Sequence, residues 1–385
     1  MKSDLSTICT YVTDKITVDK LTVDNYISTE NMLPNKCGVV KANSLPQVKQ
    51  VTHYKKGDVL VSNIRPYFKK IWLATNEGGC SNDVLVMRAR KDIETSFLYY
   101  VLSEDDFFEY STVTGKGTKM PRGDKTAIMK YQVPIIALEE QRKIVGLLNK
   151  LDKKININKE INDNLQQQAQ ALFKLWFVEH SPFDSVEPKE WKNVNLEDIT
   201  SLISRGIAPK YSDGSAQMVI NQKCIRNHMI DLSLARAHTP KAINEKWLRF
   251  GDLLINSTGD GTLGRTAQVW FQPQNLTVDS HVTIVRPIKE NLIFYIGLWG
   301  ILHEREIESL HTGSTGQTEL PRERVKALEL LLPDDETLDR FNTLVAPMTD
   351  AIVSNQEESN RLAALRNVLL PKLMSGEIDV TDIQI

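Results

Sequence analysis

The sequence lacks the marks of several large protein classes. Its four cysteines lie far apart and form no CxxC pair, so neither a zinc site nor a disulfide framework is indicated. The longest apolar stretch, residues 292–302, is about half of the ~20 residues that a membrane span requires. The first residues contain no apolar segment typical of a secretion signal. We therefore expect a cytoplasmic protein that binds no metal.

Patterns that carry catalysis are also missing. There is no Pro-Pro pair, which excludes the catalytic tetrapeptide of an adenine methyltransferase, and no Gly-x-Ser-x-Gly motif. Residues 259–266 come within one residue of a phosphate-binding loop, but Arg265 stands where that loop requires lysine. The residues that follow favour a strand, so we predict a glycine-shaped hairpin there. The chain is not expected to be an enzyme by itself.

A tandem duplication organises the chain. Residues 56–62 recur as 250–256, and residues 84–88 recur as 282–286, at offsets of 194 and 198. A glycine-rich loop that ends in Pro121-Arg122 is matched by one that ends in Pro321-Arg322. Such self-similarity indicates two copies of one structural unit. We predict strands at 59–62, 84–88, 253–256 and 282–286, and one short helix per copy, near 96–110 and 292–310.

Each copy ends in a long heptad pattern. Apolar residues alternate in steps of four and three from Ile144 to Trp176 and from Leu338 to Leu373, which is typical of a coiled-coil seam. At an offset of 197 the two seams superpose. Pro347 interrupts the second seam and predicts a kink or a fresh helix start, because proline lacks the backbone donor. Phe173, Trp176 and Phe177 are either core of the second domain or a docking face.

Polar residues in the middle of the seams predict the register. Asn158 and Asn162 match Asn355 and Ser359 at the same offset. An antiparallel pair places Asn158 opposite Ser359 and Asn162 opposite Asn355, with apolar residues meeting on both sides. A parallel pair would also match polar with polar. The folded domain that lies between the two helices favours the antiparallel arrangement, and we predict these four residues to fix the register.

The fold class is therefore predicted as α+β. Two mixed α/β domains that repeat one another are joined by two long antiparallel coiled-coil helices. We place the first domain at residues 1–134, the first spacer helix at 135–180, the second domain at 181–333, and the second spacer helix with the C-terminal tail at 334–385.

Charge is balanced overall but uneven locally. Lys plus Arg total 47 and Asp plus Glu total 49, a net charge of −2 that by itself does not indicate a nucleic-acid binder. Basic residues nevertheless outnumber acidic ones by four in 55–70 and again in 115–130, and by three around 205–226. A charged surface commonly shows such runs. Their occurrence in glycine-marked loops of both copies favours a contact surface for phosphates and base edges.

Taken together, the chain resembles the specificity (S) subunit of type I restriction–modification systems. The resemblance rests on the duplicated plan and on stretches spread over nearly the whole sequence. They are residues 24–33, Trp191 with 196–199, 206–209, 219–222, 254–259 with 263–265, 312–317, Pro134 with Glu140, Gln141 and Ile144, and 370–377. Leu338-Asp339 stands in the second helix where the first has Glu140-Gln141, which is a departure from the pattern.

The resemblance implies two target-recognition domains that each read one half of a bipartite, asymmetric double-stranded DNA sequence. It also implies two methyltransferase (M) subunits docked on the helices and motor–nuclease (R) subunits, with S-adenosylmethionine, ATP and Mg on those partners and no cofactor on this chain. The residues predicted to contact DNA are Arg65, Lys69, Lys116, Lys119, Arg122, Lys210, Tyr211, Asn256, Ser257, Arg265, Gln317 and Arg322.

Two alternatives stay open from the sequence. A coiled-coil adaptor with duplicated protein-binding domains predicts no salt-dependent binding to DNA. An enzyme that uses the Gly259 loop predicts nucleotide binding that Arg265→Ala abolishes.

Overall fold

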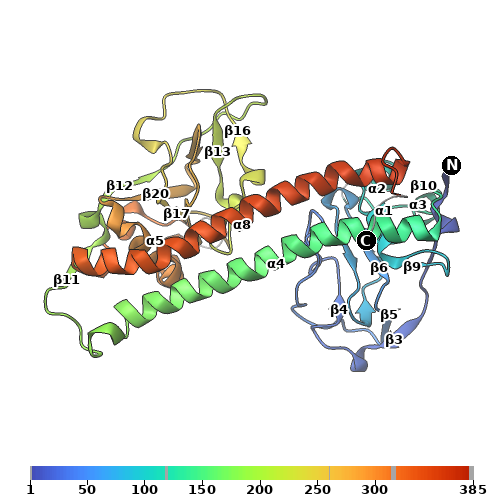
Figure 1. Cartoon of the computed structure of the whole chain (residues 1–385), viewed down its shortest axis with the longest axis horizontal. Helices are drawn as coiled ribbons and strands as arrows, with labels where there is room; N and C mark the ends of the chain where they lie inside the picture. Colours follow the sequence, from blue (N-terminus) through green and yellow to red (C-terminus); the bar gives the residue numbers. More distant parts are fainter. Residues whose placement is uncertain (1, 118–119, 260, 314–317, 381–385) are drawn as a thin grey trace. The chain divides into compact units, whose positions relative to one another are not determined.

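A computed structural model describes residues 2–117, 120–259, 261–313 and 318–380. The chain divides into two compact units, one made of residues 1–156 and 359–385 and the other of residues 157–358. Each unit contains one repeat and a part of both long helices (Figure 1). Among the described residues, no helix is both long and apolar enough to cross a membrane.

The first unit is built on two four-stranded sheets. One has the strand order β2-β9-β6-β7 and is antiparallel throughout, with bounds Cys9–Tyr11, Val84–Ala89, Val59–Ser62 and Ile71–Leu73. The other has the order β3-β5-β8-β4, with bounds Lys15–Thr17, Gln50–Tyr54, Gly78–Cys80 and Tyr26–Ile27. β1 (Lys2–Asp4) pairs with β10 (Gln132–Pro134), and the helices are α1 (Thr95–Leu102), α2 (Asp105–Val113) and α3 (Lys125–Ile128).

The second unit repeats the topology of the main sheet, whereas its smaller sheet differs. Its main sheet has the order β12-β20-β17-β18, with bounds Thr200–Arg205, Val282–Pro287, Leu253–Asn256 and Thr266–Gln268. The smaller sheet has the order β16-β13-β19, with bounds Arg236–Ala237, Met218–Ile220 and Leu276–Val278. Further elements are β11 (Lys192–Asn195) with β21 (Glu329–Leu332), the hairpin β14–β15 (Ile225–Arg226, Met229–Ile230), α5 (Ile293–Leu302), α6 (Glu304–Ser309) and α7 (Arg322–Lys326).

The four predicted strands are confirmed as β6, β9, β17 and β20. They form the centres of the two main sheets, and their residues are almost entirely buried. The one short helix predicted after them is instead two helices in each repeat, α1 with α2 and α5 with α6. The break lies at Ser103 in the first repeat and at His303 in the second, which the apolar pattern did not mark.

The same turn precedes the central strand in both repeats. Gly57 and Gly251 adopt φ of +90° and +86°, a left-handed conformation that favours glycine. The next residue is an aspartate whose carboxylate accepts two hydrogen bonds of 2.7 Å from an arginine, Arg88 to Asp58 and Arg286 to Asp252. The duplication inferred from sequence therefore extends to side-chain geometry.

The two seams form α4 (Leu138–Phe177) and α8 (Asp335–Ser375), which run antiparallel within each unit (Figure 1). In the first unit Arg366 bonds Asp152 at 2.6 Å. In the second, the Asn355 side chain donates to Asn162 at 2.9 Å, as the register predicted. α8 passes Pro347 without a break, so the predicted fresh start is wrong. Apolar residues on both sides of Pro347 are buried, and this burial outweighs one lost hydrogen bond.

Each unit has its own hydrophobic core, in which the helices pack against the main sheet. In the first, Ile144 and Leu148 of α4 and Leu373 of α8 pack with the residues of α1 and α2. In the second, Phe173, Trp176 and Phe177 are 2%, 8% and 7% exposed and pack around Phe341. Of the two interpretations of this aromatic cluster, the core is confirmed.

Candidate nucleic-acid interface

Three loops of the first unit meet at one end of β6. The backbone N–H groups of Asn35 and Lys36 donate to the carbonyls of Phe68 and Lys69, both at 2.9 Å. The N–H of Arg65 donates to Pro121 at 2.8 Å. Residues 35–36, 65–69 and 121–122 therefore form one surface, although about thirty residues separate the first segment from the second and about fifty the second from the third. We call it the basic end of the first domain.

The loop at 65–69 is held in a sharp conformation. Arg65 and Lys69 both adopt left-handed backbone angles, φ 49° and 51°, on either side of a 3-10 turn, Pro66–Phe68. This turn leaves Tyr67 and Phe68 exposed, with their rings tilted against one another at 4.8 Å between ring centres. Exposed aromatic rings beside cationic side chains are groups that contact nucleic acids by stacking and by phosphate pairing.

Acidic groups orient the cations of this surface. The carboxylate of Asp105 pairs with the ammonium groups of Lys36 and Lys69 at 2.7 and 2.9 Å. Burial acts to raise the pKa of Asp105, but the hydrogen bonds and charges of the two lysines outweigh burial and lower this pKa. Asp124 accepts Lys116 at 2.7 Å and caps α3, and these bonds lower its pKa to about 2. The carboxylates stay ionised at neutral pH, so Asp105 holds the side chains of Lys36 and Lys69 near one another and Asp124 orients Lys116.

Arg122 completes the surface, with a contact of 3.1 Å to Asp83 and a side chain that is more than half exposed. Lys119 lies outside the described residues. The basic run at 55–70 is divided by the fold: Lys55 and Lys56 precede β6, whereas Arg65 and Lys69 follow it, so a strand of about 13 Å separates them. Only the second half of that run contributes to the basic end.

The second unit corrects the prediction for Asn256 and Ser257. Both side chains are fully buried. Asn256 donates to the carbonyls of Gln222 and Thr262 at 3.0 and 3.1 Å, and Ser257 shares a 2.5 Å hydrogen bond with Thr283. Asn256 thus satisfies carbonyls of the turn that follows β17, and Ser257 ties the start of this turn to β20, so both side chains lie inside the fold and not on its surface.

The Gly259 loop is a turn between two strands of the main sheet. Arg265 donates to the carbonyl of Gly261 at 2.7 Å, and Thr266–Gln268 form β18, so the hairpin prediction is confirmed. A phosphate-binding loop leads into a helix, which this one does not. Among the described residues no cluster of histidine, cysteine and acidic side chains could hold a metal ion.

Lys210 and Tyr211 lie beside a shallow cavity of about 360 Å³ that Tyr211, Asp213 and Arg236 line. Lys210 is exposed, and the guanidinium of Arg236 stacks on the Tyr211 ring at 3.7 Å. The sequence interpretation missed Arg236, because nothing marks it as the partner of a residue twenty-five positions earlier. Cation and ring together present a flat polar surface.

Arg322 begins α7, is half exposed and contacts Glu323 at 3.1 Å; Gln317 lies outside the described residues. The predicted match of Arg122 with Arg322 is wrong. Arg122 bridges Lys116 and Ile64, and the residue with the same pairing in the second repeat is Glu319, which bridges Thr312 and Thr258. The sequence alignment matched the two Pro-Arg dipeptides, although Arg322 lies three positions after Glu319, the structural equivalent of Arg122.

Comparison with known proteins finds one recurring similarity. Residues 8–167 match the model of the type I restriction modification DNA specificity domain. The chain as a whole is similar to the MjaIX specificity subunit of Methanocaldococcus jannaschii, with 25% identity over 86% of this chain and 79% of the relative. It is also similar to the HindI specificity subunit of Haemophilus influenzae, with 23% identity over 92% and 94%.

A solved structure has the same fold. The S subunit of the type I restriction–modification system from M. genitalium superposes with a TM-score of 0.53 at 13% identity, and the match covers 97% of this chain and 96% of that one. The residues that match the family model, 8–167, include the basic end and most of α4.

Proposed function

We propose that this chain is the DNA-reading subunit of a type I restriction–modification complex, and that each repeat reads one half of a bipartite, asymmetric target. The observation that carries the proposal is the duplicated sheet end. In both repeats the central strand, β6 or β17, opens into loops that present cationic and polar side chains, and the family match of residues 8–167 includes the first of these ends.

In the first domain, Arg65, Lys69, Lys116 and Arg122 supply phosphate and base-edge contacts, together with Lys119. Arginine and lysine contacts to phosphates fix the register of a protein on the duplex, and contacts to base edges give sequence preference. In the second domain, Lys210, Tyr211, Arg265, Arg322 and Gln317 take these roles, with Arg236 added as the partner of Tyr211.

The paired helices carry the other subunits. Two methyltransferase subunits bind α4 and α8, and motor–nuclease subunits join them to cleave unmodified DNA in the cytoplasm. Adenine N6-methylation takes place on the methyltransferase subunits with S-adenosylmethionine, and ATP and Mg serve the motor–nuclease subunits. This chain binds none of these cofactors and contributes sequence recognition and assembly.

The test is base-resolution mapping of adenine methylation in cells that express a cognate methyltransferase subunit with or without this chain. The expected result is methylation at one two-part asymmetric sequence, and only when the chain is present. A coiled-coil adaptor would leave the methylation pattern unchanged. In addition, the purified chain would then show no salt-dependent binding to DNA, because it would make no phosphate contacts.

A further inference from the structure

Arg122 and Glu319 occupy the same place in the two repeats. The backbone of Arg122 exchanges two hydrogen bonds with Lys116, at 2.8 and 2.9 Å, and that of Glu319 exchanges two with Thr312 at the same distances. Two residues further on in each repeat lies the N-cap residue of a short helix, Asp124 for α3 and Pro321 for α7. One backbone frame therefore presents a cation in the first domain and an anion in the second.

The carboxylate of Glu319 is held in a fixed direction. It accepts a hydrogen bond from a terminal nitrogen of Arg205, the last residue of β12, and the other terminal nitrogen of Arg205 donates to the Leu320 carbonyl at 2.8 Å. Glu319 is still 55% exposed. It lines an open cavity of about 420 Å³ with Ser204, Gly206, Lys246 and Arg322.

The chemistry of this position restricts what it can contact on DNA. A carboxylate only accepts hydrogen bonds and is repelled by phosphate, so Glu319 cannot replace Arg122 as a contact to the backbone. In the major groove its complement is an exocyclic amino group, N4 of cytosine or N6 of adenine. Arg205, Lys246 and Arg322 line the same cavity together with Glu319 and Glu323, so cations outnumber carboxylates there and the DNA backbone can approach.

We propose that Glu319 is a specificity-determining residue of the second domain and selects a base that bears an exocyclic amino group at one position of the second half-site. Arg205 is the positioning residue, because it fixes the direction of the carboxylate. This inference rests on the proposed function. Cytosine and adenine share the chemistry that Glu319 recognises, and the experiment distinguishes them.

The experiment uses the assembled methyltransferase complex and duplexes that contain its mapped target. At each second half-site position except the methylated adenine, cytosine is replaced by 2-pyrimidinone or adenine by purine, which lack only the amino group. With the wild-type chain, one replacement is expected to slow methylation about tenfold. With Glu319→Ala, the same replacement has no further effect, because both partners of the contact are then absent.

Matched variants separate recognition from folding. Glu323→Ala removes a carboxylate from the same cavity and is expected to keep the wild-type response to every analogue. Arg205→Ala is expected to reduce the tenfold response while the first half-site stays unchanged. If the wild-type complex is insensitive at every position, or if Glu319→Ala retains full sensitivity, the inference is overturned. A complex that methylates no bipartite sequence would instead contradict the proposed function.

Discussion

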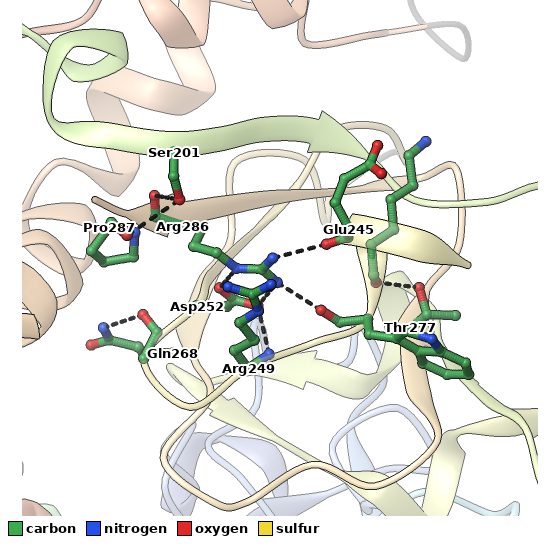
Figure 2. Close-up of polar contacts among 11 residues, drawn as sticks. Ser201, Glu245, Arg249, Asp252, Gln268, Thr277, Arg286 and Pro287 are labelled. Carbon is green, nitrogen blue, oxygen red and sulfur yellow. Dashed lines mark hydrogen bonds and ion pairs between the residues drawn. The ribbon is translucent and has the colours of Figure 1, made fainter. Parts of the chain in front are cut away.

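Arg286 holds the carboxylate of Asp252 through two hydrogen bonds of 2.7 Å, and both side chains are more than nine-tenths buried. The same guanidinium donates to the carbonyls of Glu245 and Trp247 at 2.8 and 2.6 Å, while Thr277 donates to the carbonyl of Lys246 at 2.8 Å (Figure 2). Three successive carbonyls are thereby fixed from the sheet side. This clamp holds the loop from which Lys246 reaches its cavity.

The equivalent pair in the first repeat predicts an asymmetric response to substitution. Arg88 holds Asp58 with the same geometry, but its side chain is 35% exposed. Asp252→Ala leaves a buried arginine uncompensated and should lower the free energy of unfolding by about 3–5 kcal/mol. Asp58→Ala should cost about 1.5–3 kcal/mol, because water reaches Arg88. Hydrogen exchange read separately on peptides of each unit measures both, and equal losses would contradict the interpretation.

Local patterns allowed the strands and the helix register to be predicted. The strand at 253–256 follows from its recurrence at a fixed offset, and the pairing of Asn162 with Asn355 follows from the heptad periodicity and the offset between the seams. The contact of Lys36 with Lys69 could not be predicted, because it depends on how loops close in space. Asn256 was misplaced for a related reason: a polar residue at a strand end can face solvent or the carbonyls of its own turn.

The equivalence of Arg122 and Glu319 shows a second limit of the sequence. The segment from Lys116 to Arg122 and the segment from Thr312 to Glu319 differ in length. The dipeptides Pro121-Arg122 and Pro321-Arg322 therefore match in sequence but do not occupy equivalent positions in the two folds. Backbone pairing is set by the strand end to which each loop returns. Only the structure reports that pairing, and with it the inversion of charge.

Asn162 is expected to specify the register of the helix pair more than its stability. Its side chain donates to the Ile352 carbonyl at 3.1 Å and accepts from Asn355. Asn162→Leu extends the apolar seam and should keep the free energy of unfolding within about 1 kcal/mol of the wild-type value. It should, however, permit the helices to pair in other registers. Light scattering and the stoichiometry of methyltransferase binding measure this effect. Asn164→Leu, an exposed change on the same helix, is the control, and a variant with wild-type stoichiometry and affinity would count against the role.

Glu104 predicts a pH dependence of stability. Burial, with a smaller contribution from Asp106, raises its pKa from 4.5 to about 7. Between these values the folded chain holds a proton that the unfolded chain has released, so the free energy of unfolding falls as pH rises from 4.5 to 7. Glu104→Gln should remove this slope and stabilise the protein at pH 8 by about 1–2 kcal/mol. Urea unfolding at pH 5 and pH 8 measures it. Glu109→Gln, an exposed change on α2, should retain the slope.

Arg122 and Lys55 form a matched pair for the DNA surface, because both are exposed cations next to β6 but at opposite ends of it. Arg122→Ala should remove one phosphate contact, weaken binding across sequences, and reduce the slope of log K against log salt by about 1. Lys55→Ala changes the net charge equally and should leave the slope unchanged. Filter binding of the assembled complex between 50 and 200 mM salt separates the two. Equal effects of both substitutions would mean that overall charge, and not the basic end of the first domain, attracts DNA.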